Sequence, residues 1–285
     1  GNHGNMLEDC RDTCRLARLA RPMLTHDEFD RLCAIDRVGF KTQRFVCAYD
    51  RDAAEGALEA ALTELCIDVE QAVRDGVNLV VLTDRTAEGE VPIPSLLSLA
   101  AVHNHLIAVG LRTDADLIVE TGDAMRAHDF ACLVGYSASG IYPYAAHECI
   151  RDLCERGEIS IPGDEAVANY DRAVVAGITS IMSKMGISTM QGYHSAQIFE
   201  ILGLDDSLVE KYFTHTSTRI GGLDAAGVQR ELNERYDSAL ALEKSPSPEQ
   251  LPTLGVTAWR PLGGEEHLIN PQTIYLLQRA CREGD

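Results

Sequence analysis

Basic residues are scarce in this sequence: it has 25 Lys and Arg against 44 Asp and Glu, which gives a formal net charge of −19 at pH 7. Nucleic-acid phosphates are held by clusters of Lys and Arg, and the sequence contains no such cluster. It also lacks an apolar run of the ~18 residues that a membrane-spanning helix requires, and a basic and apolar leader at its start. We therefore expect no nucleic-acid partner, no membrane contact and a cytoplasmic location.

The nine cysteines are odd in number and lie mostly within apolar patterns. Only Cys10 with Cys14 and Cys149 with Cys154 form close pairs, and neither pair has the further cysteines that a zinc or iron–sulfur site needs. We predict reduced, buried thiols and no metal. The chain begins with Gly1 rather than Met, and we expect it to be a processed or excised part of a longer protein.

Strand and helix patterns alternate in the first half of the chain. Four short apolar runs have the composition of strands: 44–49, 78–82, 116–119 and 139–142. Three segments between them place apolar residues at helical spacing: 57–74, 95–109 and 124–133. Strands separated by helices form βαβ units. The sequence therefore predicts an α/β fold with a mainly parallel sheet, flanking helices and right-handed crossovers, together with a Pro-rich loop at 84–94.

Helical patterns continue on either side of this region. Thr25 to Glu28 has the form of a capping box, which predicts the start of a short helix. Past residue 143 the patterns are helical, with no convincing strand: 143–156, 164–184, 195–203, 205–213 and 224–240. We expect a domain at 1–244, with the α/β sheet at about 40–145 and a helical C-terminal layer at about 146–244. A Pro/Ser linker at 245–255 and an arm at 256–285 follow.

Histidines form the densest polar group in the sequence. His103, Asn104 and His105 lie late in a predicted helix, and His128 with Asp129 follows a predicted strand. Residues i and i+2 project from different faces of a helix, so His103 and His105 are not expected to bind one metal ion. We interpret these histidines as hydrogen-bonded structural residues.

Small residues gather at two turns beside the predicted strands, at 121–123 and at 135–140. The glycines of these turns are Gly122, Gly135 and Gly140. Such residues let backbone N–H groups approach a phosphate, as in the late loops of a (β/α)8 barrel. Against this, Glu120 and Asp123 place negative charge where the anion would sit. We predict tight βα turns. The alternative is a stand-alone barrel-like protein that binds a phosphorylated ligand or flavin there.

The stretch from Ser183 to His194 has no simple period and lies between helical patterns. Such a loop can bind a ligand or pack against a partner. Lys184 as a Schiff-base lysine, or Ser188 or Ser195 as a nucleophile, would need an activating neighbour. The sequence shows neither a G-x-S-x-G elbow nor a nearby acid–base set. We therefore predict a packed interface loop and no catalytic residue.

The same loop carries a family resemblance. Lys-Met-Gly-Ile-Ser-Thr-Met-Gln at 184–191 and Ala-Gln-Ile-Phe-Glu at 196–200 closely resemble a signature of the glutamate synthase large subunit. Further segments match that family in the same order: 82–85, 93–97, 101–106, 110–112, 119–122 and 217–222. Small departures occur, such as Gly192 and Ser195 where the family has Ser and Gly. The similarity runs from about residue 5 to the last residue.

Large subunits of that family contain a glutaminase domain, a central domain, an FMN-binding barrel with an iron–sulfur cluster, and a β-helix. The resemblance implies that this chain is the central domain, a rudimentary relative of the barrel, running into the start of the FMN-binding domain. The parent enzyme makes L-glutamate from glutamine and 2-oxoglutarate with electrons from NADPH, NADH or ferredoxin. Its FMN, its cluster and its catalytic residues would all lie outside this chain, which we therefore expect to bind no cofactor and to be inactive alone.

The resemblance further implies a scaffold role. The central domain would connect the glutaminase and FMN-binding domains of the same parent chain and help to wall the ammonia channel. We expect the interdomain contacts at Lys184, Met185, Gly186, Ile187, Ser188, Gln191, Tyr193 and Gln197. A separately encoded subunit that assembles with glutaminase and FMN chains is a further alternative.

Overall fold

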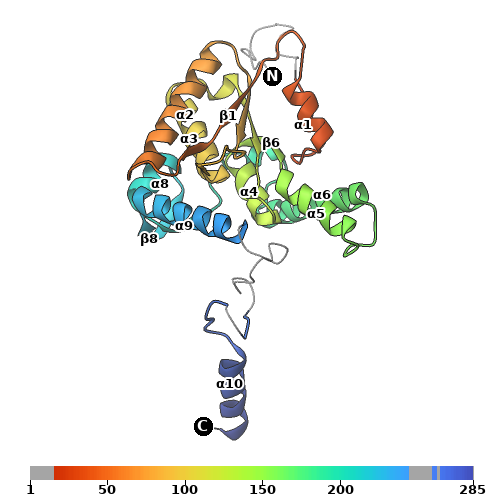
Figure 1. The fold of residues 1–285 in the computed structure, drawn as a ribbon, viewed down its shortest axis with the longest axis vertical. Coiled ribbons are helices and arrows are strands. Elements are labelled where there is room, and N and C mark those ends of the chain that lie inside the picture. The colour runs from red at the N-terminus through yellow and green to blue at the C-terminus, as the bar shows by residue number, and fades with distance from the viewer. Residues whose placement is uncertain (1–15, 244–258, 262–263, 285) are drawn as a thin grey trace. The chain divides into compact units, whose positions relative to one another are not determined.

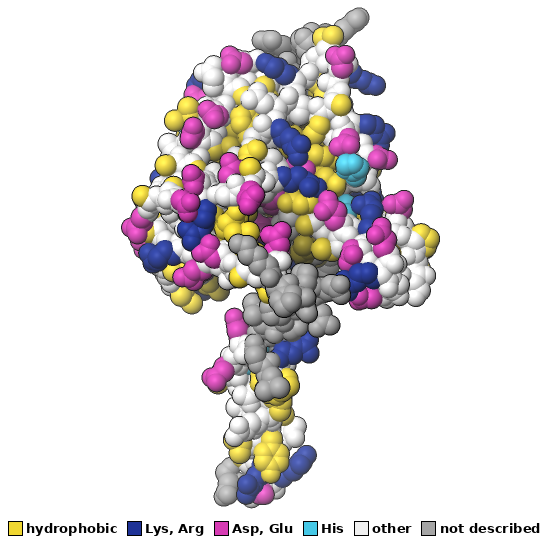
Figure 2. All heavy atoms as spheres, in the orientation of Figure 1, with side chains coloured by type: hydrophobic (Ala, Val, Ile, Leu, Met, Phe, Trp, Pro, Cys, Tyr) yellow, Lys and Arg dark blue, Asp and Glu magenta, His cyan; other side chains and the backbone are white. Residues whose placement is uncertain are grey.

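The computed structural model describes residues 16–243, 259–261 and 264–284 (Figure 1). Residues 1–234 and 235–285 form two compact units. The linker predicted at 245–255 and the close pair of Cys10 and Cys14 lie outside the described residues. Charged side chains of both signs lie interspersed over the face of the first unit that Figure 2 shows.

Four parallel strands form the main sheet of the first unit. They are β1 (Thr42–Val46), β3 (Leu79–Thr83), β5 (Asp116–Glu120) and β6 (Ala138–Tyr142), in the order β1-β3-β5-β6. Each strand pairs in parallel with the next of the four along the chain. The predicted α/β class with a mainly parallel sheet is therefore confirmed. β1 and β6 are the outer strands of this sheet, and a single parallel bridge joins Met23 to Ile141 on the outer side of β6. Within the described residues the sheet stays open and closes no barrel.

Three helices connect these strands and cover one face of the sheet: α2 (Ala57–Arg74), α3 (Ser95–Ala108) and α4 (Ala127–Gly135). All five residues of β3 are buried, as expected for a parallel strand that is covered on both faces. Successive side chains of a strand point to opposite faces. Val80 and Leu82 therefore point to one face of the sheet, and Leu79 and Val81 to the other.

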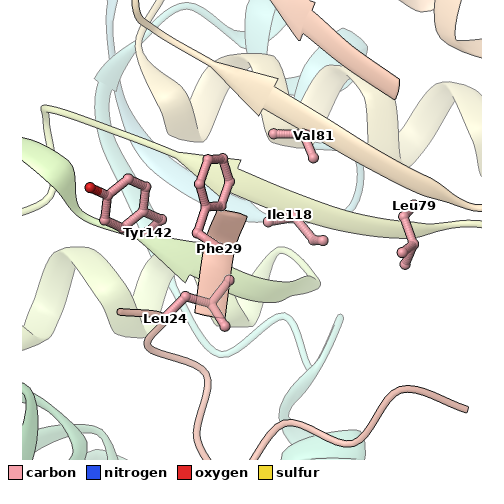
Figure 3. Close-up of a cluster of buried hydrophobic side chains, with 6 residues drawn as sticks. All are labelled: Leu24, Phe29, Leu79, Val81, Ile118 and Tyr142. Atoms are coloured by element: carbon pink, nitrogen blue, oxygen red, sulfur yellow. The ribbon is translucent and has the colours of Figure 1, made fainter. Parts of the chain in front are cut away.

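The other face is covered by the segment before the first strand and by α1 (His26–Cys33). Figure 3 shows the buried cluster formed there by Leu24, Phe29, Leu79, Val81, Ile118 and Tyr142. The ring of Phe29 stacks on that of Tyr142 with 4.7 Å between centroids, and burying a side chain of this size contributes about 1.5–3 kcal/mol. Thr25 and Glu28 form the predicted capping box at the start of α1.

A two-stranded antiparallel sheet lies beside the main sheet. Its strands are β2 (Ala48–Asp50) and β4 (Glu90–Pro92). The predicted strand at 44–49 is thus split between β1 and β2, and the stretch at 84–94, predicted as a loop, contains a short strand. Pro92 fits into β4 because a strand with a single neighbour has a free edge, where a missing N–H group is tolerated.

The predicted helical C-terminal layer is confirmed. It contains α5 (Tyr144–Glu155), α6 (Gly163–Met185), α7 (Met190–Tyr193), α8 (Asp206–Tyr212) and α9 (Ala225–Glu243). The prediction that no strand follows residue 143, and that 195–203 is helical, is wrong. β7 (Glu200–Leu204) and β8 (Ser217–Leu223) form a two-stranded parallel sheet. Glycines interrupt both strands and most of their residues are at least partly exposed, so the sequence shows no period-two pattern.

The second unit contains α10 (Pro271–Glu283), which lies within the predicted arm at 256–285. Asn270 caps this helix by accepting hydrogen bonds from the backbone N–H groups of Gln272 and Thr273, and proline begins it. None of the helices in the described part of the chain is long and apolar enough to cross a lipid bilayer.

Candidate functional site

The turn at 121–123 follows β5 and is filled by a side chain of the protein. One carboxylate oxygen of Asp84 accepts hydrogen bonds from the Gly122 backbone N–H at 2.7 Å and from the Thr121 hydroxyl at 3.0 Å. The Ser95 hydroxyl, at the start of α3, donates to the same oxygen at 3.2 Å. Burial raises the pKa of Asp84. The donors that would cradle a phosphate are therefore engaged by a buried carboxylate.

The second turn, at 135–140, lies at the opposite end of the sheet. Only residues 135–137 precede β6, because 138–140 belong to that strand, so the turn is shorter than predicted. The turn at 121–123 follows β5, and the two strands are parallel. A Cβ on Gly135 would lie 2.4 Å from the ring of Phe199, and one on Gly140 would lie 3.1 Å from Leu24. These glycines provide close packing. The structure does not bring the two turns into one site, and their residues do not fit the phosphate of FMN.

The histidines of α3 form separate hydrogen bonds. His105 Nε2 lies 2.7 Å from a carboxylate oxygen of Glu70 on α2, and the Asn104 amide donates to the carbonyl of Tyr212 at 2.7 Å. His103 is buried and bonds to other residues. His103 and His105 are thus hydrogen-bonded, as predicted, and their purely structural role stays a prediction.

His128 and Asp129 act within α4. The His128 ring lies 3.6 Å from the Cys132 sulfur, one helical turn on, and the Asp129 carboxylate accepts from the backbone N–H groups of Met125 and Arg126 before the helix. Burial raises the pKa of the Cys132 thiol to about 11, so it is protonated at neutral pH. No three His, Cys, Asp or Glu side chains of the described residues are grouped as a metal site.

The cysteines of the described residues are free thiols. Cys47 and Cys66 are buried, as predicted, whereas Cys149 and Cys281 are exposed and Cys33, Cys132 and Cys154 lie between. The prediction of buried thiols is thus wrong for the exposed pair. Both of those cysteines lie on helices with wide solvent-facing surfaces, α5 and α10.

The loop predicted as an interface has a defined conformation. Gly186 ends α6 with a positive φ of 71°, and Thr189 caps the short helix α7. Tyr193 is fully buried, so its side chain faces the interior of the first unit. The other seven contact candidates are exposed or half-buried: Lys184, Met185, Gly186, Ile187, Ser188, Gln191 and Gln197.

Lys184 and Met185 form one wall of an apolar groove of about 450 Å³. Its other walls come from α3, α4, β7 and the end of α8 and include Leu96, Tyr136, Phe199, Ile201 and Phe213. Met185 keeps 51% of its surface exposed beside the groove. Leu202 and Ile220 are paired residues of β7 and β8, and both are exposed as well. Apolar side chains are therefore gathered at the surface on and beside the predicted interface loop.

Sequence reasoning missed a hydrogen-bonded relay that reaches the same loop. Arg112 Nε donates to His103 Nδ1 at 2.8 Å, and His103 Nε2 lies 2.9 Å from the Ser195 hydroxyl. Arg112 also donates to the carbonyls of Ala115 and Ser137 at 2.6 and 3.1 Å. Because 92 residues separate His103 from Ser195, no local sequence motif predicts that they are hydrogen-bonded.

The relay sets the tautomer of His103. A guanidinium N–H can only donate, so Nδ1 of His103 carries no proton and the proton lies on Nε2. His103 therefore donates to Ser195 instead of accepting its proton. Burial, and next the charge of Arg112, lower the pKa of His103 to about 4. Ser195 and His103 thus have the spacing of a nucleophile and its general base. His103 cannot act as that base, because its Nε2 already carries a proton.

Comparison with known proteins connects this geometry to a family. The model of the glutamate synthase central domain matches residues 1–205. The NADPH glutamate synthase large chain of Bacillus subtilis is 36% identical over 286 residues, which cover 100% of this chain and 18% of that protein. A ferredoxin-dependent glutamate synthase of Synechocystis is 38% identical and covers 98% of this chain and 18% of its own length. The NADH glutamate synthase of Schizosaccharomyces pombe is 34% identical, with 99% and 14% covered.

Solved structures give a weaker likeness. The flavin-binding domain of baker's yeast flavocytochrome b2 is similar over 71% of this chain and 46% of that one, with a TM-score of 0.37 and 16% identity. The family match covers more than half of the chain, and the curated relatives extend over nearly all of it. The chain spans less than a fifth of the length of those relatives. The chain belongs to the glutamate synthase central domain family.

Proposed function

We propose that this chain is the non-catalytic central module of a glutamate synthase large subunit. It connects the glutaminase domain to the FMN-binding domain and contributes to the wall of the ammonia channel between them. The observation that carries this proposal is the apolar groove beside Met185, together with the exposed apolar pair on β7 and β8. Large apolar patches on a folded surface mark contacts with other protein surfaces.

The chemistry of the described residues supports a scaffold. His103 holds its proton on the nitrogen that faces Ser195, so it cannot act as the base for that hydroxyl. Asp84 engages the donors of the turn at 121–123. The reaction of the parent enzyme, with its FMN and iron–sulfur cluster, is therefore assigned to other domains of the longer chain.

The test uses the full-length large subunit that contains this domain. Met185→Glu places a carboxylate in the groove, and burying it against an apolar partner costs several kcal/mol. We expect this variant to keep hydrolysing glutamine while the glutamate formed per glutamine hydrolysed falls by about tenfold or more. Ile67→Glu is the matched control, because Ile67 on α2 is an apolar residue of similar exposure, 57% against 51% for Met185. It should leave the ratio unchanged.

Equal ratios for the wild type and Met185→Glu would refute the proposed contact, as would an equal loss in Met185→Glu and Ile67→Glu. A second measurement addresses the cofactor. The separately purified chain is incubated with excess FMN and desalted, and we expect no flavin absorbance to remain. Retained flavin would favour a cofactor site within this chain instead of a scaffold.

A further inference from the structure

A cavity of about 260 Å³ lies beside the relay that ends at Ser195. Its walls come from the end of α3, the end of α4, the segment at 195–199 and the segment at 214–216. The lining residues that matter for the chemistry are His103, Ala108, Tyr136, Ser195, Gln197 and Phe199. The cavity thus combines a few convergent polar groups with aromatic and aliphatic walls, which is the composition of small-molecule sites.

Strained backbone surrounds this cavity. Among the described residues, four non-glycine residues have positive φ angles: Ser137, Ser195, Gln197 and His215, at 71°, 56°, 53° and 66°. The last three line the cavity, and Ser137 is hydrogen-bonded to Ser195. Residues with side chains adopt this region at a cost, and such conformations cluster where a ligand is bound. Their convergence on one cavity singles it out within the described part of the chain.

The hydrogen bonds around Ser195 determine whether its own hydroxyl hydrogen is available to a ligand. His103 Nε2–H donates to the Ser195 oxygen, and the hydroxyls of Ser137 and Ser195 lie 2.9 Å apart. Ser137 is buried, so its hydroxyl hydrogen would be left unpaired if Ser195 were the donor between them. Ser137 therefore donates to Ser195. The hydroxyl hydrogen of Ser195 then has no acceptor among the described residues, and the residue itself is exposed and lines the cavity.

The positive charge of Arg112 determines which kind of acceptor the Ser195 hydroxyl binds best. Arg112 donates into the relay, so the positive end of each hydrogen bond points from Arg112 through His103 towards Ser195. The same positive field lowers the pKa of His194, after burial as the larger cause. A hydroxyl polarised in this way binds an anionic oxygen more strongly than a neutral one.

We propose that this cavity binds a small carboxylate, whose oxygen accepts the hydroxyl hydrogen of Ser195 and whose hydrocarbon part packs against the wall formed by Tyr136 and Phe199. Ala108 lies at the outer rim and is exposed. The cavity volume limits the ligand to about the size of an aromatic monocarboxylate. The cavity shares Tyr136 and Phe199 with the groove beside Met185, whereas His103 and Ser195 line only the cavity.

The test uses benzoate as the probe and thermal unfolding of the 285-residue chain as the readout. At a benzoate concentration about ten times its Kd, mass action predicts that Tm rises by roughly 3–6 °C. Sodium chloride at equal ionic strength is the salt control. Benzamide has the same shape without the charge, and we expect it to raise Tm less.

Two variants connect the effect to this cavity. Ser195→Ala removes the donor and should weaken benzoate binding about tenfold. Ala108→Phe fills the cavity from an exposed position and should abolish the Tm rise with little effect on the fold, whereas Ile67→Phe, at an exposed site on α2, should keep it. The proposal is overturned if the wild type shows no benzoate-dependent rise beyond the salt control, or if Ala108→Phe shows the same rise as the wild type.

Discussion

The side-chain oxygen of Gln229 accepts a hydrogen bond from the backbone N–H of Leu58, 3.2 Å away, so a residue of α9 caps the first turn of α2. The same oxygen accepts from the N–H of Gly56 at 3.1 Å, and the Gln229 amide donates to the carbonyl of Ala54 at 3.1 Å. Gly56 is the N-cap of α2 and forms no side-chain cap of its own. A distant residue thus satisfies donors that a helix usually satisfies locally.

Gln229→Ala should destabilise the first unit by about 2–4 kcal/mol, because three hydrogen bonds of a buried side chain are lost and two backbone donors are left without a partner. Urea unfolding should show a lower midpoint with an unchanged slope. Gln71→Ala is the control, since Gln71 bonds to Asp75 on the exposed side of α2, and its loss should stay below about 0.5 kcal/mol. Equal midpoints for the two variants would contradict the capping role.

Neighbouring glycines of β8 should respond oppositely to alanine. A Cβ on Gly222 would lie 2.2 Å from the carbonyl oxygen of Gly203 on β7, whereas one on Gly221 would meet nothing within 4 Å. We expect Gly222→Ala to cost about 3 kcal/mol and to speed hydrogen exchange in β7 and β8. Gly221→Ala should change stability by less than about 0.5 kcal/mol. Similar exchange rates in both variants would refute this close approach.

The α/β half of the fold was predictable because its signals are local. β3 is a continuous apolar run between turn residues, and α2 repeats apolar residues at helical spacing. β7 and β8 give no such signal. They carry Gly203, Gly221 and Gly222, and most of their residues are exposed or half-buried. Their pairing depends on backbone contact between distant segments, which single-sequence patterns do not encode.

The sequence predicted which residue types the candidate sites contain, but not which of these residues contact one another. The sequence indicated that His103 is structural, and it placed glycines at both turns. It gave no sign that Asp84 reaches the turn after β5, since 38 residues separate Asp84 from Gly122. Nor could it bring Arg112, His103 and Ser195 into one relay, because these residues come from three different elements. Only the polar run His103-Asn104-His105, after the mostly apolar first part of α3, hinted that His103 has a specific partner.

Replacing Glu120 should destabilise the protein less than replacing the two arginines that pair with it. Its carboxylate is 3% exposed and pairs with Arg44 and Arg85, which keep 48% and 42% of their side-chain surface in water. Removing both arginines leaves a buried carboxylate without a partner, so Arg44→Met with Arg85→Met should cost about 3–5 kcal/mol. Glu120→Met leaves arginines that water can solvate, and should cost below about 2 kcal/mol. Chemical denaturation of the three proteins checks this order, and the reverse order would contradict it.

His103 should make the protein less stable as the pH falls. Burial and the charge of Arg112 hold its pKa at about 4 in the folded chain, against an ordinary value of 6.5. The unfolded chain therefore takes up the proton first. The stability that the neutral ring contributes is fully present above pH 6.5 and is lost as the pH falls through 4. The whole effect amounts to about 3 kcal/mol.

His103→Gln isolates this effect from the carboxylates that titrate in the same range. Glutamine can accept from Arg112 and donate to Ser195, and it has no charge to gain. Between pH 7 and pH 4, the unfolding free energy of the wild type should therefore fall by about 3 kcal/mol more than that of this variant. A difference that stays constant with pH would mean that the folded chain accepts the proton on His103 as readily as the unfolded one. The tautomer set by Arg112 would then be wrong, and with it the direction of the relay to Ser195.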